Sequence, residues 1–193
     1  MAPPEMVGHP DEEGMAPWHP VSSPIDDELI SGFEQFLGAT LPPLFKEYLS
    51  YRSLLYVDLY EGTLPDIDPR RPLSWLEWCV RESRLLFGRV RDRLVPFTLG
   101  PAGDGVLCFD THMPGDRGDY PVVIVPHAGA GSLKERTPNE WCNQPVFRSF
   151  ESYLEFLRDW LTYTHEGPAV DFASWLALHE RPAPPACYYG AGL

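Results

Sequence analysis

Apolar residues recur at helical spacing after residue 24 and again after residue 40, and the two stripes predict two consecutive helices. The first is expected to start at the acids that follow Pro24 and to end at Gly38, because acids suit the positive end of a helix and glycine caps its C-terminus. The second is expected to open at Pro42 and Pro43, since a missing N–H costs little in a first turn. The two stripes are Leu29, Phe33, Phe36 and Leu37, and then Leu41, Leu44, Phe45, Tyr48 and Leu49.

Runs of β-branched and aromatic residues predict strands in the middle of the chain. They cover residues 54–60, 94–98, 106–110 and 121–126. The segment 100–105 is rich in glycine, so it is expected to join the second and third of these strands as a tight hairpin turn.

Further helices are predicted on both sides of these strands. Ser74 and Glu77 have the spacing of a capping box, which predicts a helix over residues 74–87. Apolar residues at helical spacing predict a further helix over residues 149–163, capped by Ser149. A shorter helix is predicted over residues 170–179. Helices at both ends with strands between them predict an α+β fold, an antiparallel β-sheet with helices packed mainly on one face.

The pattern also divides the chain into one domain and two tails. Residues 1–23 are rich in proline, glycine and acids, and they are expected to form a flexible acidic leader. Residues 24–181 are expected to form a single domain, and residues 182–193 a C-terminal tail. The total of 193 residues suits one domain of this kind.

The charge of the chain narrows the class of partner. There are 28 acidic residues against 15 basic ones, a net charge of −13, with 44% hydrophobic and 13% aromatic residues. This composition is typical of a globular protein, and its charge is repelled by phosphate backbones and anionic lipid heads. The N-terminus lacks the features of a secretory signal, and no apolar run is long enough to span a bilayer. We therefore expect a cytoplasmic protein that binds neither nucleic acid nor membranes, and a basic partner is the natural complement.

One segment has the opposite charge. Seven arginines and three acids lie between Arg70 and Arg93, so this stretch has a local net charge of +4 and the remainder of the chain carries −17. No pattern of aromatic and basic residues typical of nucleic-acid recognition accompanies the arginines. They could pair with the acidic leader or contact a partner.

Residues that could catalyse a reaction or bind a metal form no recognisable motif. The six histidines include no pair at i, i+4 and no HExxH, and the glycine-rich segments lack the context of a phosphate loop, so we expect neither a metal nor a cofactor. The best single candidate for a functional histidine is His127, just after a predicted strand, although a hydrogen-bonded histidine at a rim is the commoner role. The cysteines form no CxxC pair and are expected to be reduced and structural: Cys79, Cys108, Cys142 and Cys187.

Acidic residues gather in loops between the predicted elements. A solvated rim explains most such clusters, and the alternative is an acidic surface that binds a partner. The candidate partner-binding residues are Asp58, Glu61, Asp66, Asp68, Asp104, Asp116 and Asp119.

Four segments, in order, resemble the SMI1/KNR4-type proteins of the SUKH superfamily. The first is IDDELISGFEQFLGATLPPLFKEYL, in which Leu41, Pro42, Phe45, Lys46, Tyr48 and Leu49 stand at the positions of the family's second helix. The others are LVPFTLGPAGDGVLCFD, PVVIVPH and SFESYLEFL. Together they span residues 25–162 approximately, most of the predicted domain.

The resemblance implies a binding module rather than an enzyme. Bacterial proteins of this superfamily resemble immunity proteins that neutralise secreted toxins, often nucleases, and fungal ones act as interaction scaffolds. We therefore expect a monomer or weak dimer that binds a cognate bacterial toxin with a basic surface, because opposite charges speed association. Two alternatives stay open: a regulatory scaffold that binds through its leader, and a hydrolase centred on His127.

Overall fold

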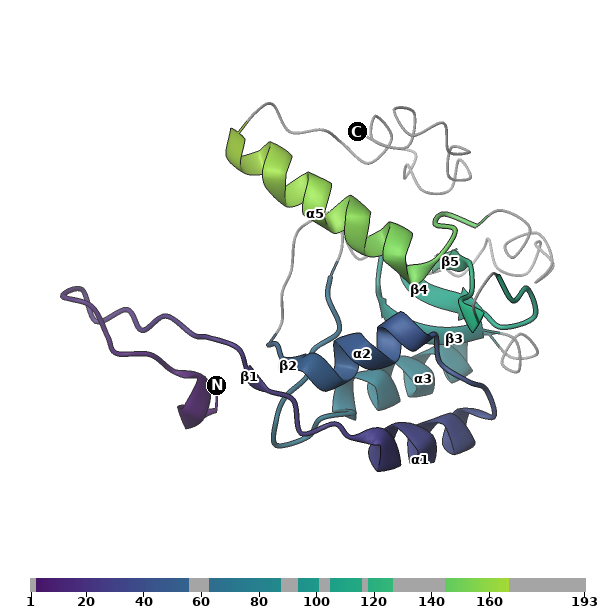
Figure 1. Ribbon diagram of the computed structural model, residues 1–193, viewed down its shortest axis with the longest axis horizontal. Helices are drawn as coiled ribbons and strands as arrows, with labels where there is room; N and C mark the ends of the chain where they lie inside the picture. The colour runs from purple at the N-terminus through teal and green to yellow at the C-terminus, as the bar shows by residue number, and fades with distance from the viewer. Residues whose placement is uncertain are drawn as a thin grey trace.

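The computed structural model describes residues 3–55, 63–87, 94–100, 105–115, 118–126 and 145–166. Its elements, in chain order, are η1 (Pro4–Met6), β1 (Val21–Ser22), α1 (Asp27–Leu37), α2 (Pro43–Tyr51), β2 (Arg52–Ser53), α3 (Ser74–Phe87), β3 (Leu94–Leu99), β4 (Gly105–Asp110), β5 (Val122–Pro126) and α5 (Phe150–Glu166). Figure 1 shows α1, α2 and α3 gathered beside the sheet, with α5 running across its other end. The fold is α+β, as predicted; the further expectation, that the helices pack mainly on one face, stays a prediction.

The N-terminal residues fold back on themselves before they reach the domain. The N–H of Gly8 donates to the carbonyl of Pro17 (2.7 Å), and a Cβ at Gly8 would lie 2.9 Å from that oxygen, so this crossing requires glycine. Figure 1 shows the resulting hairpin extending away from the helices and the sheet. Its last residues join the body, because β1 pairs with β2 and the Ser23 hydroxyl donates to the Leu49 carbonyl (2.6 Å). The boundary at residue 23 stays a prediction.

Helix α1 begins and ends, and helix α2 begins, where the sequence signals predict. The Asp26 carboxylate accepts from the N–H of Leu29 (2.9 Å) as an N-cap, and Gly38 adopts the left-handed conformation (φ 73°) that ends α1. Glu34 then fixes the turn, since its carboxylate accepts from the N–H of Leu41 (2.7 Å) and pairs with Lys46 (3.2 Å). These bonds set α2 immediately after α1.

The strand predicted over residues 54–60 is wrong for the two of its residues that the structure describes. Strand pairing stops at Ser53, and Leu54 and Leu55 are irregular. The reason is that the carbonyl of Leu54 accepts from the N–H of Ile67 (2.7 Å), in a loop rather than in a neighbouring strand. Residues 56–60 lie outside the described residues.

The central sheet has the order β3-β4-β5, with both pairs antiparallel. All three strands were predicted within one residue of their observed ends. Pro96 lacks an N–H and lies in β3, which has only one partner strand among the described residues, and the register shifts between Pro96 and Thr98 as in a β-bulge. Buried side chains point to both faces: one face has Val95, Phe97, Leu107, Phe109, Val122 and Ile124, and the other has Leu94, Val106, Cys108, Val123 and Val125. The continuous apolar runs in the sequence reflect this burial on both faces.

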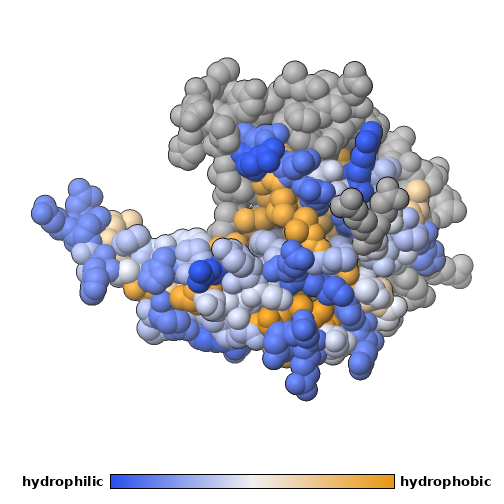
Figure 2. Space-filling view, in the orientation of Figure 1, coloured by the Kyte–Doolittle hydropathy of each residue, from blue (hydrophilic) through white to orange (hydrophobic). Residues whose placement is uncertain are grey.

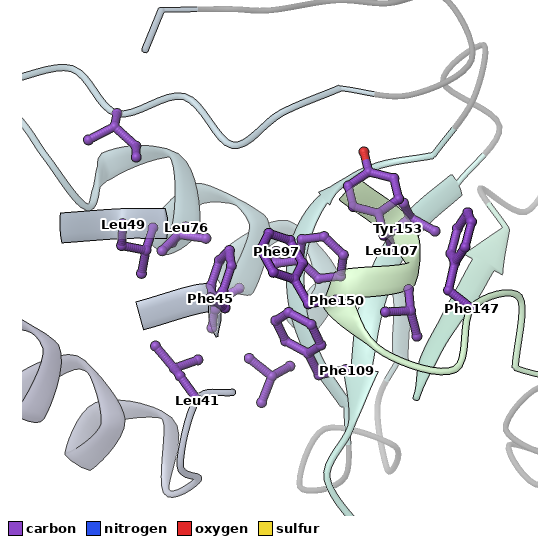
Figure 3. Close-up of a cluster of buried hydrophobic side chains, with 14 of the residues drawn as sticks. Leu41, Phe45, Leu49, Leu76, Phe97, Leu107, Phe109, Phe147, Phe150 and Tyr153 are labelled. Atoms are coloured by element: carbon purple, nitrogen blue, oxygen red, sulfur yellow. The ribbon is translucent and has the colours of Figure 1, made fainter. Parts of the chain in front are cut away.

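The larger core is an aromatic cluster between the sheet, α2 and α5 (Figure 3). Phe97 and Phe109 stack at a centroid distance of 4.3 Å, and Phe45 meets Phe150 edge-on at 4.9 Å. Every one of these four rings is fully buried. Rings from one strand pair and two helices therefore interlock in one place, with the geometry that aromatic pairs prefer.

A buried polar group joins three distant segments of the chain beside this cluster. The carbonyl of Thr63 accepts from the hydroxyls of Thr98 (2.8 Å) and Tyr153 (2.6 Å). Burial raises the pKa of Tyr153, so its hydroxyl remains protonated and donates. The loop before α3, the strand β3 and the helix α5 are held together by these bonds.

Helices α3 and α5 also agree with the sequence. Helix α3 covers the predicted range, although the N–H of Glu77 donates to the carbonyl of Leu73 (2.9 Å), so Ser74 lies inside the helix rather than capping it. The hydroxyl of Ser149 accepts from the N–H of Ser152 (3.1 Å) and caps α5 as predicted. The predicted helix over residues 170–179 lies outside the described residues. None of the described helices combines the length and the apolar character needed to cross a bilayer.

Candidate protein-interaction surface

Helix α1 exposes apolar residues beside the face that it buries. Ile30 and Phe33 point into the core, whereas Leu29 is 40% exposed and Phe36 is 51% exposed. Leu29, Gly32 and Phe36 are spaced i, i+3 and i+7, so they form one line along the helix. The apolar arc of α1 is therefore wider than the core that covers it.

The exposed Phe36 ring rests on a residue of the core. It stacks on Phe33 at a centroid distance of 6.0 Å and an interplanar angle of 30°. Because Phe33 is only 5% exposed, it provides a fixed support. Contact with a partner would therefore order Phe36 at little additional entropic cost.

A groove runs between this line and α3. Its main part has a volume of about 920 Å³, and a second part of about 460 Å³ continues toward the turn that precedes α3. We call it the α1–α3 groove and define it by Leu29, Gly32, Phe36, Leu73, Glu77 and Arg81. Figure 2 shows hydrophobic patches enclosed by hydrophilic residues on the face of the molecule that carries α1 and α2. Apolar area with a polar border is the usual arrangement of a protein-binding surface.

The charges along the groove are mostly negative on the α1 side. Asp26, Asp27 and Glu28 are exposed at the start of α1, and α1 contains no basic residue. Glu77 and Arg81 project from α3 on the opposite wall. The wall made by α1 thus favours basic groups, whereas the opposite wall is more basic than acidic, since Arg71 and Arg81 line it beside Glu77.

Three of the predicted partner-binding acids are described, and none of them lines the groove. Asp66 acts on Tyr48, whose hydroxyl donates to the Pro65 carbonyl (3.1 Å). The pKa of this hydroxyl is raised first by burial and then by the negative charge of Asp66. Asp119 accepts from its neighbour's N–H through its carboxylate (2.8 Å) and lines a separate pocket of about 530 Å³ at the starts of α2 and α5. Asp58, Glu61, Asp104 and Asp116 lie outside the described residues, and the acidic rim stays a prediction.

The third described acid, Asp68, is engaged within the chain. Its two carboxylate oxygens accept from the Nε (3.0 Å) and Nη2 (2.9 Å) atoms of Arg70, and this hydrogen bonding holds the pKa of Asp68 below its ordinary value. The hydrogen bond and charge of Asp68, and then the charge of Glu5, raise the pKa of Arg70. Glu5 belongs to the N-terminal hairpin, so part of the leader's charge lies near the start of the arginine-rich stretch. This favours the pairing of Arg70 with the chain's own acids.

Leu29, Gly32 and Phe36 were not among the predicted site residues. Leu29 and Phe36 belong to the apolar stripe that predicted α1, and a stripe of this kind normally points inward. The width of the stripe was the available signal that part of it is exposed, because α1 has five apolar residues in eleven, more than one buried face accommodates. A glycine in the middle of the same helix was the second signal.

The structure describes only some of the cysteines and histidines that were considered as catalytic or metal-binding residues. Among the described residues, Cys79 and Cys108 are buried, as predicted, and neither is in a disulfide; burial raises the pKa of the Cys79 thiol to about 12. His127 lies outside the described residues. Across the ranges that the structure describes, no three histidine, cysteine or acidic side chains gather as metal ligands would.

A scan of protein-family models and a search of curated proteins each give no match to this chain. The SMI1/KNR4-type resemblance of the four motifs therefore stays a prediction.

Proposed function

We propose that the protein is an immunity protein, which binds a cognate secreted bacterial toxin and neutralises it by protein-protein interaction. The observation that carries the proposal is the exposed line of Leu29 and Phe36 along the α1–α3 groove. In an interface, a half-exposed phenylalanine that already stacks on the core would serve as an aromatic anchor.

The charge of the chain indicates the class of toxin. The chain has a net charge of −13, and every charged residue of α1 is acidic. Such a surface attracts a basic partner and accelerates their association. Nuclease toxins are basic where they grip phosphate, so a nuclease is the class that this charge fits best. The protein would act in the cytoplasm and would need no cofactor.

Co-expression with the product of the neighbouring open reading frame tests this function. Cells that make the neighbour alone should die, and cells that also make this protein should grow. If the neighbour is harmless alone, or stays lethal beside this protein, the immunity function is wrong.

Two variants connect the function to the groove. Phe36→Asp places a charge in the apolar line and should abolish protection, while Tyr51→Asp, at the similarly exposed end of α2, should leave protection intact. Both variants must first show the circular dichroism and melting temperature of a folded protein. Protection that survives Phe36→Asp would leave the function standing and remove the groove as its site.

A regulatory scaffold that binds through its leader is the second candidate, favoured by the N-terminal hairpin. This hairpin exposes Val7 (42%), Met15 (68%) and Trp18 (42%) around an acidic tip. Deletion of residues 1–20 removes the hairpin and keeps β1. An immunity protein should still protect after this deletion, whereas a scaffold of this kind should lose its partners in pull-down experiments.

A further inference from the structure

Gly32 occupies a position in the middle of α1 where nothing within the described chain requires glycine. Its backbone is not in the left-handed region, and a Cβ added there would meet no atom within 4 Å. Glycine inside a helix is nevertheless less stable than alanine, because it loses more backbone freedom on folding. The glycine therefore has a cost in helix stability, and no contact among the described residues offsets that cost.

The benefit of Gly32 becomes clear in the context of the groove. It lies between Leu29 and Phe36 on the exposed line, so it leaves a gap between two apolar side chains. A small residue at a helix crossing lets a second helix approach to the short end of the usual 8–10 Å axial separation. Apolar positions at i, i+3 and i+7 are also the spacing at which one helix receives another.

We propose that the α1–α3 groove receives one amphipathic helix of the partner protein, with an apolar side chain over Gly32 and basic residues beside α1. The charges select this occupant. Asp26, Asp27 and Glu28 would pair with lysine or arginine on the helix flank. A second copy of this chain would instead bring the acids of one molecule toward those of another that also carries −13.

The inference deepens the proposed function, since it names the partner element that the immunity protein would hold, but its test needs no toxin. The probe is a fluorescent helical peptide of roughly 18 residues, with leucine at the a and d positions, lysine on the flank that would face α1 and uncharged polar residues on the other flank. Its affinity for the full-length protein is measured by fluorescence anisotropy. The bound site is located by changes in backbone amide NMR shifts.

Shift changes should centre on residues 28–36 of α1 and on residues 73–81, from the turn before α3 into that helix. Gly32→Trp fills the gap and should weaken binding about tenfold or more. Ser50→Trp makes the same small-to-large change at an exposed position of α2 and should bind the peptide as the parent protein does. Glu28→Lys should also weaken binding, more than Glu12→Lys, which makes the same charge change at the tip of the N-terminal hairpin.

Other peptides separate the shape of the groove from simple charge attraction. A scrambled peptide of the same composition and a peptide with glutamate in place of every lysine should both bind about tenfold more weakly or worse. Equal binding of the scrambled peptide, shift changes away from the groove, or indifference to Gly32→Trp would each overturn the inference. So would sedimentation showing a dimer of the parent protein that Gly32→Trp dissociates, because the occupant would then be a second copy.

The two proposals can fail separately. Protection from the toxin that survives Gly32→Trp would leave the immunity function intact and exclude the groove. Peptide binding in the groove by a protein that gives no protection would support the groove as a helix-binding site and exclude the immunity function.

Discussion

The aromatic cluster under α5 and the α1–α3 groove contain the same kinds of apolar side chain, but the cluster buries them and the groove leaves them partly exposed. Phe97 is fully buried among rings from β4, α2 and α5, while Phe36 is 51% exposed and stacks on Phe33 of its own helix. The cluster is closed because elements far apart in sequence converge on it. On the groove side, α1 and α3 leave their apolar line open to solvent. The comparison separates apolar residues that hold the fold together from apolar residues that are available to a partner.

The largest expected difference between the two regions is in stability. Phe97→Ala should lower the free energy of unfolding by about 3–5 kcal/mol, because it leaves a cavity within close-packed rings. Phe36→Ala should lower it by about 1 kcal/mol or less, since half of that side chain already contacts water. Urea unfolding of both variants measures the contrast, and equal losses would mean that Phe36 belongs to the core.

A pH titration should distinguish the two sides of α3. Burial on the core side raises the pKa of Cys79 to about 12, so the folded protein keeps a proton that the unfolded chain loses above about 8.5. The stabilisation is therefore complete at neutral pH and is lost as the pH rises toward 12, by about 1.4 kcal/mol per pH unit.

The measurement is the stability of the parent protein at pH 7 and pH 10, compared with that of Cys79→Ala. The parent should lose about 2 kcal/mol more than the variant over this interval. Equal slopes would show that the thiol is accessible, and that this side of α3 is as open as the groove.

The polar part of the core should contribute less than its rings. Tyr153→Phe removes the hydroxyl that donates to the Thr63 carbonyl, but Thr98 still donates to that oxygen, so no buried acceptor is left unsatisfied. We expect a loss of about 1 kcal/mol in thermal or urea unfolding. A loss as large as that of Phe97→Ala would mean that this junction, rather than ring packing, holds the three segments together.

The smallest effect should have the opposite sign. Gly32→Ala should raise the free energy of unfolding by about 0.5–1 kcal/mol, because alanine is the better helix former and its methyl group enters open space. A destabilised Gly32→Ala protein would show that the groove is filled from within the chain.

Local signals account for most of the secondary structure. Asp26 and Gly38 bound α1, Pro43 opens α2 and Ser149 caps α5, and each acts through atoms a few residues away. The strand predicted at Leu54 failed because its carbonyl bonds to Ile67, a contact that no local pattern encodes. Three of the predicted acids, Asp66, Asp68 and Asp119, lie at three different sites within the described chain. That they bind a partner stays a prediction.

The α+β class, the acidic charge and the positions of the central strands follow from the amino-acid sequence, because periodicity, composition and turn residues act at short range. Which apolar residues of α1 are covered by the core depends on tertiary packing. That outcome depends on how many elements converge on each side of the helix, and the width of an apolar stripe does not say which of its residues are covered. The groove beside Gly32 is the result of that difference.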